Sequence, residues 1–154
     1  MKKKILWGLL ALLVIIQFLR PTRNRAAELS TNDISRHYTV PDTIAAILKH
    51  SCNDCHSNNT IYPWYVNIQP VGWWLQNHVN EGKSELNFSE FAAYPPKRQA
   101  HKLEEMTKSV KDDDMPLNSY LWIHSNARLS ATDKELLIKW ADSLRTEIAR
   151  KNGL

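Results

Sequence analysis

The sequence predicts an all-α protein, and three observations support this fold class. Four segments of the 154-residue chain place apolar residues three and four positions apart, which is the spacing of one helix face. No segment of any length alternates apolar and polar residues, as a half-buried strand would. Proline or serine stands near the start of each helical segment, where these residues favour helix initiation. The length and the hydrophobic content of 43% favour a single globular domain.

The N-terminal segment has the composition of an export signal. Lysines at positions 2–4 precede an apolar run from Ile5 to Leu19, which is the charged and apolar pattern of secretory signals. The run is short for a membrane-spanning helix, which usually needs about 20 residues. Because Arg20-Pro21 follows where a cleavage site would have small residues, we expect residues 1–20 to stay as a signal anchor. This single transmembrane segment would lie in a bacterial inner membrane with the body facing the periplasm; the alternative is a cleaved, soluble periplasmic protein.

The basic charge of the chain belongs to its N-terminus. The formal net charge is +4, but residues 1–25 hold six basic residues and no acidic one. The rest of the chain has 14 Lys and Arg against 16 Asp and Glu, a formal charge of −2. Binding to nucleic acid is therefore not expected, since it requires cations clustered on the folded part. Residues 21–40 have little apolar periodicity and are expected to form a polar tether.

Two helices are expected in the first half of the body. The first begins at Pro41 and runs directly into Cys52. The second begins at Pro70, and we expect Gly82 to end it, because glycine is common just after a helix. The apolar face of the first consists of Ile44, Ile47 and Leu48, and that of the second consists of Val71, Trp74, Leu75, His78 and Val79.

Two further helices are expected in the second half. The third begins at or just after Pro95-Pro96 and ends before Met115-Pro116, since the residue before proline avoids the helical region. The fourth is capped by Ser130 or Thr132, each followed three positions later by an acidic residue. The expected buried residues are Ala100, Leu103, Met106 or Thr107, and Val110 in the third helix, and Leu136, Leu137, Trp140, Leu144 and Ile148 in the fourth.

The chemically most informative segment is Cys52-Asn53-Asp54-Cys55-His56. It has the C-x-x-C-H spacing of c-type haem attachment, and it contains both cysteines of the chain. Two thiols one helical turn apart can bond the two vinyl groups of haem, and the histidine that follows can bind the iron. Three other interpretations are a structural zinc site, a thioredoxin-like redox pair and a structural disulfide. A structural zinc site would normally need four ligands, but the chain has no second pair of cysteines. A thioredoxin-like redox pair should follow a strand, whereas a helix is expected before this motif.

A haem iron bound by His56 has a second axial position. We expect Met115 to fill it, because this methionine lies in an irregular segment before a proline and about sixty residues from the motif. Met106 fits the packing face of its helix and is expected in the core. His78 is the main rival; as a histidine on an apolar stripe it could instead bond a haem propionate. The other candidates are His37, His50, His101 and His124.

Aromatic residues follow the motif closely. Packed on a porphyrin, Tyr62, Trp64, Tyr65 and Trp74 would exclude water, and a Tyr hydroxyl or Trp N–H could bond a propionate. The alternative is an aromatic cluster with only a packing role. We therefore include these four residues, with His78, among the candidate cofactor-binding residues.

The chain resembles the family of small bacterial haem-binding domains of exported c-type cytochromes. The resemblance covers about residues 41–141. It rests on the motif with Ser57-Asn58-Asn59-Thr60, on Tyr62-Pro63-Trp64-Tyr65, Trp73-Trp74, Leu86-Asn87-Phe88-Ser89-Glu90, Met115-Pro116-Leu117 with Tyr120, and Leu136-Leu137-Ile138-Lys139-Trp140-Ala141. It implies a cytochrome c-like helical fold, one covalent haem on Cys52 and Cys55, and His56 as proximal ligand. It also suggests Met115 as distal ligand, but implies no reaction or partner.

These observations lead to an expected function. We expect a cytochrome c-like haem-binding domain over residues 41–150 that carries electrons to or from an unidentified redox partner protein. Ligation by His56 and Met115 fills both axial positions, which favours electron transfer over catalysis, so no catalytic residue is expected. The alternative is a haem-based sensor or a peroxidase-like enzyme in which the distal ligand is displaced.

Overall fold

The computed structural model describes residues 1–154 and confirms the all-α fold. It contains no strand, only an isolated bridge between Arg25 and Asn59. The elements are α1 (Lys2–Ile16), α2 (Ile34–His37), α3 (Asp42–Ser51), α4 (Asn53–His56), the 3-10 helix η1 (Trp64–Asn67), α5 (Val71–Glu85), η2 (Phe88–Ala93), α6 (Pro96–Lys111), α7 (Asn118–Leu121), η3 (Ser125–Ala127) and α8 (Ala131–Asn152).

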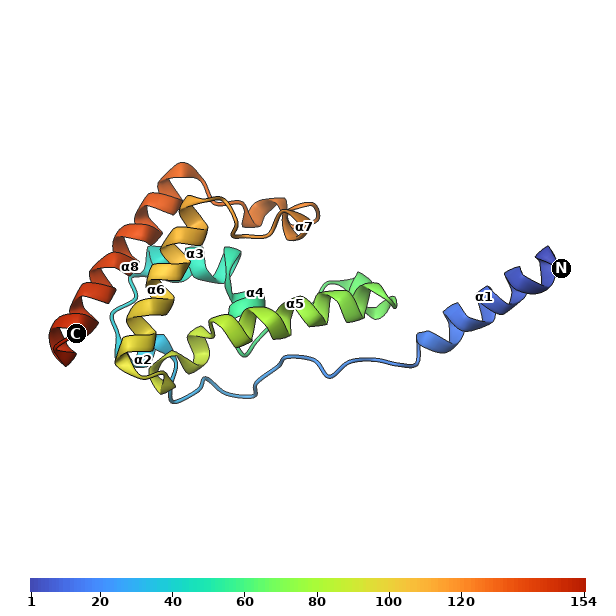
Figure 1. Ribbon diagram of the computed structural model, residues 1–154, viewed down its shortest axis with the longest axis horizontal. Coiled ribbons are helices and arrows are strands. Elements are labelled where there is room, and N and C mark those ends of the chain that lie inside the picture. Colours follow the sequence, from blue (N-terminus) through green and yellow to red (C-terminus); the bar gives the residue numbers. More distant parts are fainter.

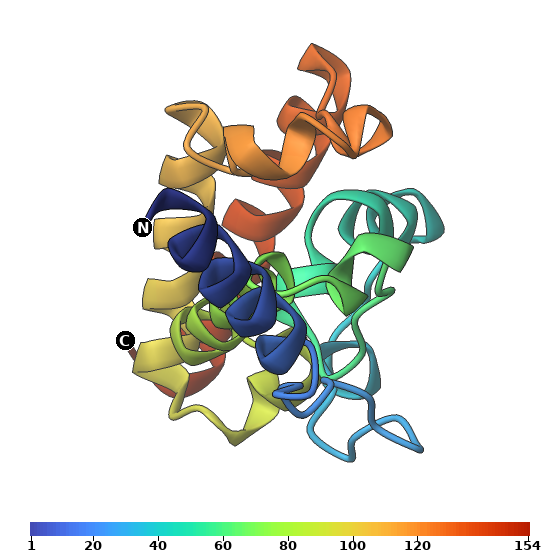
Figure 2. The same cartoon turned by 90° about the vertical axis from the view of Figure 1, so that its right-hand side faces the viewer.

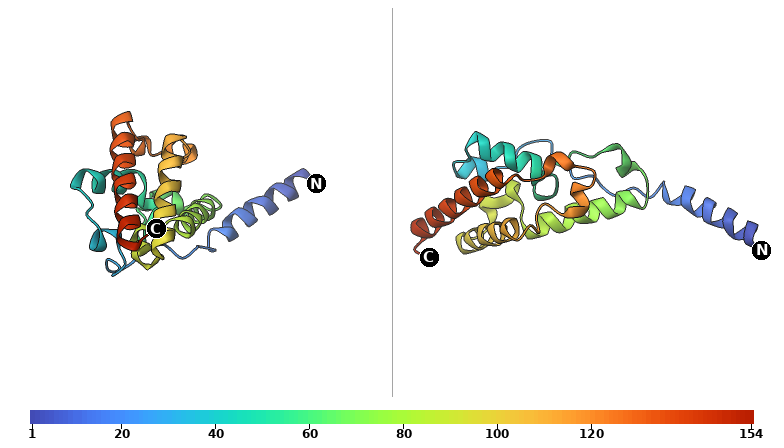
Figure 3. Two further views of the ribbon diagram at one scale, coloured as in Figure 1. Left: turned by 60° about the vertical axis from the view of Figure 1, so that its left-hand side comes forward. Right: turned by 90° about the horizontal axis from the view of Figure 1, so that it is seen from above.

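The core lies where α6, α8 and α3 meet. Helices α6 and α8 run side by side, with α3 packed against α8 (Figures 1 and 3). Ile44, Ile47 and Leu48 are buried, as the pattern predicts. Each fully buried side chain of this kind stabilises the fold by roughly 1.5–3 kcal/mol. The fully buried residues at the α6–α8 contact include Leu103, Leu137 and Ile148.

The helix starts agree with the sequence, but several buried positions do not. Ser130 caps α8 in a capping box with Asp133, and Pro95 precedes α6. On α8, Leu136 is exposed and Ala141 is buried in its place. On α6, Thr107 is buried, while Met106 is only partly buried against the core. Leu103 and Val110 on α6 and Leu137, Leu144 and Ile148 on α8 are buried as predicted, whereas Ala100 and Trp140 are only partly buried.

Helix α5 differs most from the expectation. It begins after Pro70 as predicted, but it continues through Gly82 to Glu85. Its buried residues are Gly72, Gln76 and Val79. Val79 alone of the predicted stripe is buried; Val71 and Trp74 are exposed and Leu75 and His78 are intermediate. Gly82 therefore lies inside the helix, and tertiary packing, not helix termination, explains why a glycine stands at this position.

The N-terminal helix projects away from the body (Figures 1 and 3). It ends at Ile16 and has 15 residues, none of them buried. At 1.5 Å per residue it is roughly 22 Å long, whereas the hydrocarbon core of a membrane is about 30 Å thick. No helix in the structure has both the length and the apolar character needed to cross a membrane, so the expected transmembrane segment over residues 1–20 is not supported.

Residues 21–40, expected to be a tether, make specific contacts with the body. The side chain of Asn24 donates to the Ser57 carbonyl (2.8 Å) and the Thr60 hydroxyl (2.9 Å). Ile34 in α2 belongs to the core. Figure 2 shows the domain from the end at which α1 projects. In this view the segment passes along the side of the domain that α4 and the residues after it form. Polar side chains, which carry no periodic signal, make most of these contacts.

Candidate functional site

The two cysteines lie at the junction of α3 and α4. Helix α3 ends at Ser51, and Cys52 leaves helical geometry (φ −125°, ψ −43°) so that the chain turns into α4. The amides of Cys55 and His56 both donate to the Cys52 carbonyl, at 3.1 and 3.0 Å. This single turn holds the motif as one compact unit. Both cysteines are partly buried free thiols, so no disulfide joins them.

Both thiols are protonated at neutral pH. Burial raises the pKa of Cys52 to about 12, and the neighbouring Cys55 adds to the effect. Burial also raises the pKa of Cys55 to about 11, with a contribution from the Asp54 carboxylate. A thioredoxin-like redox pair depends on a lowered thiol pKa. The observed direction is the opposite and argues against that interpretation.

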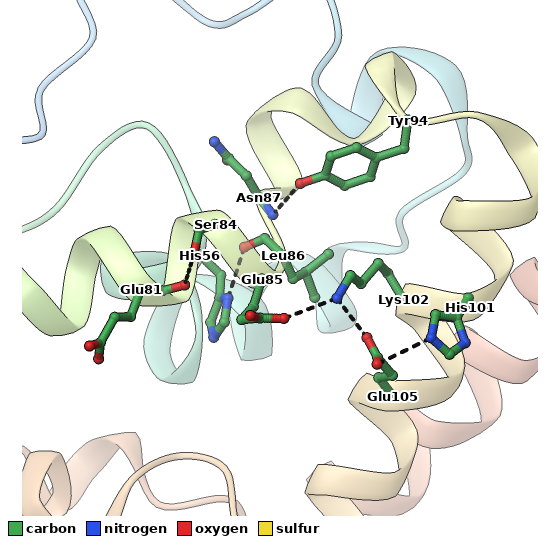
Figure 4. Close-up of polar contacts among 10 residues, drawn as sticks. All are labelled: His56, Glu81, Ser84, Glu85, Leu86, Asn87, Tyr94, His101, Lys102 and Glu105. Carbon is green, nitrogen blue, oxygen red and sulfur yellow. Dashed lines mark hydrogen bonds and ion pairs between the residues drawn. The ribbon is translucent and has the colours of Figure 1, made fainter.

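One ring nitrogen of His56 is already bonded to the protein. Its Nδ1 lies 2.9 Å from the Leu86 carbonyl oxygen (Figure 4). Because a carbonyl only accepts, Nδ1 carries the proton, and a neutral ring then has its lone pair on Nε2. Burial lowers the pKa of His56, which keeps the ring neutral. A backbone acceptor of this kind fixes the tautomer and the ring orientation of metal-binding histidines.

Gly82 allows α4 and α5 to approach closely. A Cβ at this position would lie 2.8 Å from the Cys55 carbonyl oxygen and 3.0 Å from the Cys55 Cβ. Real side chains do not tolerate such contacts, so any other residue would push the motif away from α5. Sequence reasoning missed this role because a glycine near a helix end also fits a C-cap.

Two adjoining cavities lie beside the motif, with volumes of about 430 Å³ and 290 Å³. Ligand pockets commonly measure about 300–1,000 Å³. The loop after α6 reaches this hollow, and Met115 is 36% exposed there. The two cavities adjoin, because six residues line both: Ser51, Cys52, His56, Glu85, Met115 and Pro116. The hollow therefore brings a thiol, a neutral imidazole and a thioether together, and these groups fit a haem.

The other predicted site residues are divided between two places. Tyr65, Trp74 and His78 line a small cavity of about 70 Å³ beside Cys55, and His78 also lines the 290 Å³ cavity. Tyr62 and Trp64 line none of the three cavities. The Tyr62 hydroxyl instead accepts from the backbone amide of Asn24 (2.7 Å) and donates to the side-chain oxygen of Gln76 (2.6 Å). Trp64 is 75% exposed.

The remaining candidate ligands are distributed around the hollow. Met106 lines the 430 Å³ cavity and His124 lines the 70 Å³ cavity. The ring of His78 is tied by Nδ1 to the Trp74 carbonyl (2.9 Å). The others lie elsewhere: His101 pairs with Glu105, His37 bonds the Thr31 carbonyl and His50 is exposed.

Sequence reasoning missed a polar contact that supports the motif. The Tyr120 hydroxyl donates to the Asp54 carboxylate (2.7 Å), and the other oxygen of Asp54 accepts from the Ile61 amide (2.9 Å). The Tyr120 ring stacks on His124, with centroids 4.2 Å apart. Asp54 thus connects α4 to α7 through Tyr120, and to the loop that follows α4 through Ile61. Its position inside the motif was the only available signal.

A family model described as a haem-binding domain matches residues 11–143. The chain belongs to this haem-binding domain family. No curated protein and no solved structure gives a match. Membership identifies haem as the cofactor. The structure does not support a structural zinc site. No group of three or more His, Cys, Asp or Glu side chains is placed to hold a metal ion.

Proposed function

We propose that this protein is a one-haem c-type cytochrome that transfers electrons. Cys52 and Cys55 attach the haem, His56 is its proximal ligand and Met115 its distal ligand. The observation that carries the proposal is the hydrogen bond from His56 Nδ1 to the Leu86 carbonyl (2.9 Å). It leaves Nε2 free to bind iron in a hollow that Cys52 and Met115 also line.

Covalent attachment follows from the chemistry of the two thiols. Each thiol adds across one haem vinyl group: its sulfur bonds the carbon next to the ring, and its hydrogen goes to the terminal carbon. The addition is redox-neutral and needs a reduced thiol. Both Cys52 and Cys55 are free. The close contact of Gly82 with Cys55 holds the second thiol against α5 at the edge of the hollow.

The end of α6 supports Met115 as the distal ligand. Asp113 adopts a left-handed conformation (φ 62°), which aspartate tolerates better than most residues. The amides of Asp114 and Met115 both donate to the Ser109 carbonyl, at 3.0 and 3.3 Å. Asp113 also forms an ion pair with Lys134 of α8. These contacts turn the chain back from the helix and hold Met115 at the hollow.

Two protein ligands favour a carrier over a catalyst. Bound haem supplies an iron that exchanges one electron between Fe(II) and Fe(III). Side chains from His56 and Met115 leave no open position for a substrate, and a thioether ligand raises the reduction potential. We further propose that residues 1–20 direct export to the periplasm, where a redox partner protein exchanges the electron.

Production with a cytochrome c maturation system tests covalent attachment. Under denaturing conditions the full chain should keep the mass of one haem, and its alkaline pyridine spectrum should be that of two thioethers. Cys52→Ala and Cys55→Ala should each give a one-thioether spectrum or no haem. A haem-free product, obtained while a control cytochrome matures normally, would disprove the proposal.

Substitution of the candidate ligands tests the axial assignment. Met115→Ala should abolish the sulfur-to-iron charge-transfer band of the oxidised protein, because the thioether is removed from the iron. Met106→Ala is the matched control, since Met106 lines the same cavity and should leave the band unchanged. If the band persists in Met115→Ala and disappears in Met106→Ala, the assignment is wrong.

A haem-based sensor or peroxidase-like enzyme is the second candidate. It is favoured by the 36% exposure of Met115 and by its location on a loop instead of a packed helix. Such a ligand could leave the iron when a small molecule arrives. Prompt binding of carbon monoxide to the reduced protein, or turnover of peroxide, would favour this function over a simple carrier.

A further inference from the structure

Charge is distributed unequally around the hollow. The 430 Å³ cavity is lined by two lysines, Lys102 and Lys108, both on α6, and by the carboxylates of Glu85, Glu105 and Asp114. The 290 Å³ cavity has no lysine or arginine in its lining, which instead includes the carboxylates of Asp54, Glu81 and Glu85. The α6 end is therefore the only part of the hollow that offers a cationic partner to an anionic group of a ligand.

Lys102 is the more buried of the two cations. Its side chain is 11% exposed, whereas Lys108 is exposed. Its ammonium donates to Glu105 at 2.7 Å and to Glu85 at 3.1 Å (Figure 4). The side chains of Glu105 and Glu85 are 48% and 76% exposed. The cation is thus the interior member of the group, and the two carboxylates lie on its solvent side. Hydrogen bonds to Glu105 and Glu85 outweigh this burial and raise the pKa of Lys102, so its ammonium stays charged.

The ammonium also has donor capacity left. It carries three N–H groups, and Glu105 and Glu85 account for two of them. A third acceptor on the cavity side would complete the bonding of Lys102 without displacing either carboxylate. The apolar residues Leu86 and Phe88 also line this cavity.

The chemistry of haem supplies such an acceptor. Its two propionates lie on the side of the macrocycle opposite the two vinyl groups. Cys55 lines the 290 Å³ cavity but not the 430 Å³ cavity, so attachment there directs the propionate side toward α6. We propose that Lys102 binds one haem propionate and that Glu85 and Glu105 hold its ammonium at the mouth of the cavity. This inference rests on the proposed attachment of haem to Cys52 and Cys55.

Resonance Raman spectroscopy of the haem-loaded full chain tests the inference. The propionate-bending band depends on hydrogen bonding to the carboxylate. It should shift in Lys102→Met, toward the position of a propionate bonded only by water, and should stay at the wild-type position in Lys108→Met. Lys108 is the matched control, because it is a lysine of the same helix and cavity. An unshifted band in Lys102→Met overturns the assignment.

A second variant keeps the test decisive if Lys102→Met does not mature. The double variant Glu85→Gln with Glu105→Gln keeps Lys102 but neutralises its two carboxylate partners. The ammonium should then bond the propionate more strongly and shift the band in the opposite direction, and an unmoved band again overturns the assignment. A wild-type protein without covalent haem would instead disprove the proposed function, so the two failures are distinguishable.

Discussion

Replacing Gly82 with alanine tests the packing that holds the attachment motif. The new Cβ would lie 2.8 Å from the Cys55 carbonyl oxygen, so α4 and α5 must separate by a few tenths of an ångström. Overpacking costs about 1–3 kcal/mol. Because the nearest atom is the backbone oxygen of Cys55, which cannot swing aside, the upper part of this range, about 2–3 kcal/mol, applies. The better helix propensity of alanine offsets roughly 1 kcal/mol. The net expectation is a loss of about 1–2 kcal/mol. For a domain of this size the melting temperature should fall by roughly 2–8 °C.

Gly8→Ala is the matched control for this substitution. Gly8 is also inside a helix, but nothing lies within 4 Å of its added Cβ. The same replacement there should leave the melting temperature of the domain unchanged. Thermal unfolding of the haem-loaded variants, followed by far-ultraviolet circular dichroism, measures the difference. The mass of the denatured chain reports the fraction that carries haem, and this fraction should fall only in Gly82→Ala.

The sign of the effect makes the test decisive. Glycine to alanine inside a helix ordinarily stabilises it, so a loss of stability at Gly82 can arise only from the contact with Cys55. If Gly82→Ala melts at or above the wild-type temperature and attaches haem in full, the close approach of the two helices is not required, and the reasoning is wrong.

Two further predictions concern protonation. In the haem-free folded chain, the pKa values of Cys52 and Cys55 are about 12 and about 11. At pH 8 both should react with iodoacetamide more slowly than in denaturant, by a factor on the order of a thousand for Cys52 and a hundred for Cys55. Equal rates would contradict the raised values. Ser130→Ala should cost about 1 kcal/mol at pH 7, the value of a lost helix cap. Hydrogen bonds from Ser130 lower the pKa of Asp133, so their contribution is present above the unfolded-state pKa and is lost as the pH falls through the folded-state pKa. Urea unfolding should therefore show a smaller difference at pH 3 than at pH 7, and a constant difference would argue against the capping box.

The sequence was sufficient for the helices but not for all of their faces. Periodicity located α3, α6 and α8, because the core they share is built from apolar residues at helical spacing. The stripe of α5 had the same pattern, yet Val71, Trp74 and His78 line a cavity beside Cys55 instead of the core. Apolar spacing shows which residues share a face, but it does not distinguish a face packed against protein from a face that lines a cavity.

The candidate site divides in the same way between local and long-range information. The motif identified the two thiols and His56 because their chemistry depends on spacing within five residues. The orientation of His56 depends on the Leu86 carbonyl, thirty positions further along the chain, and no pattern in the sequence reports that contact. Leu86 directly follows α5, and Gly82 of the same helix contacts Cys55. One helix therefore sets the position of the thiol and of the imidazole together, so a shift of α5 should disturb the proposed haem attachment and the proposed iron ligation at the same time.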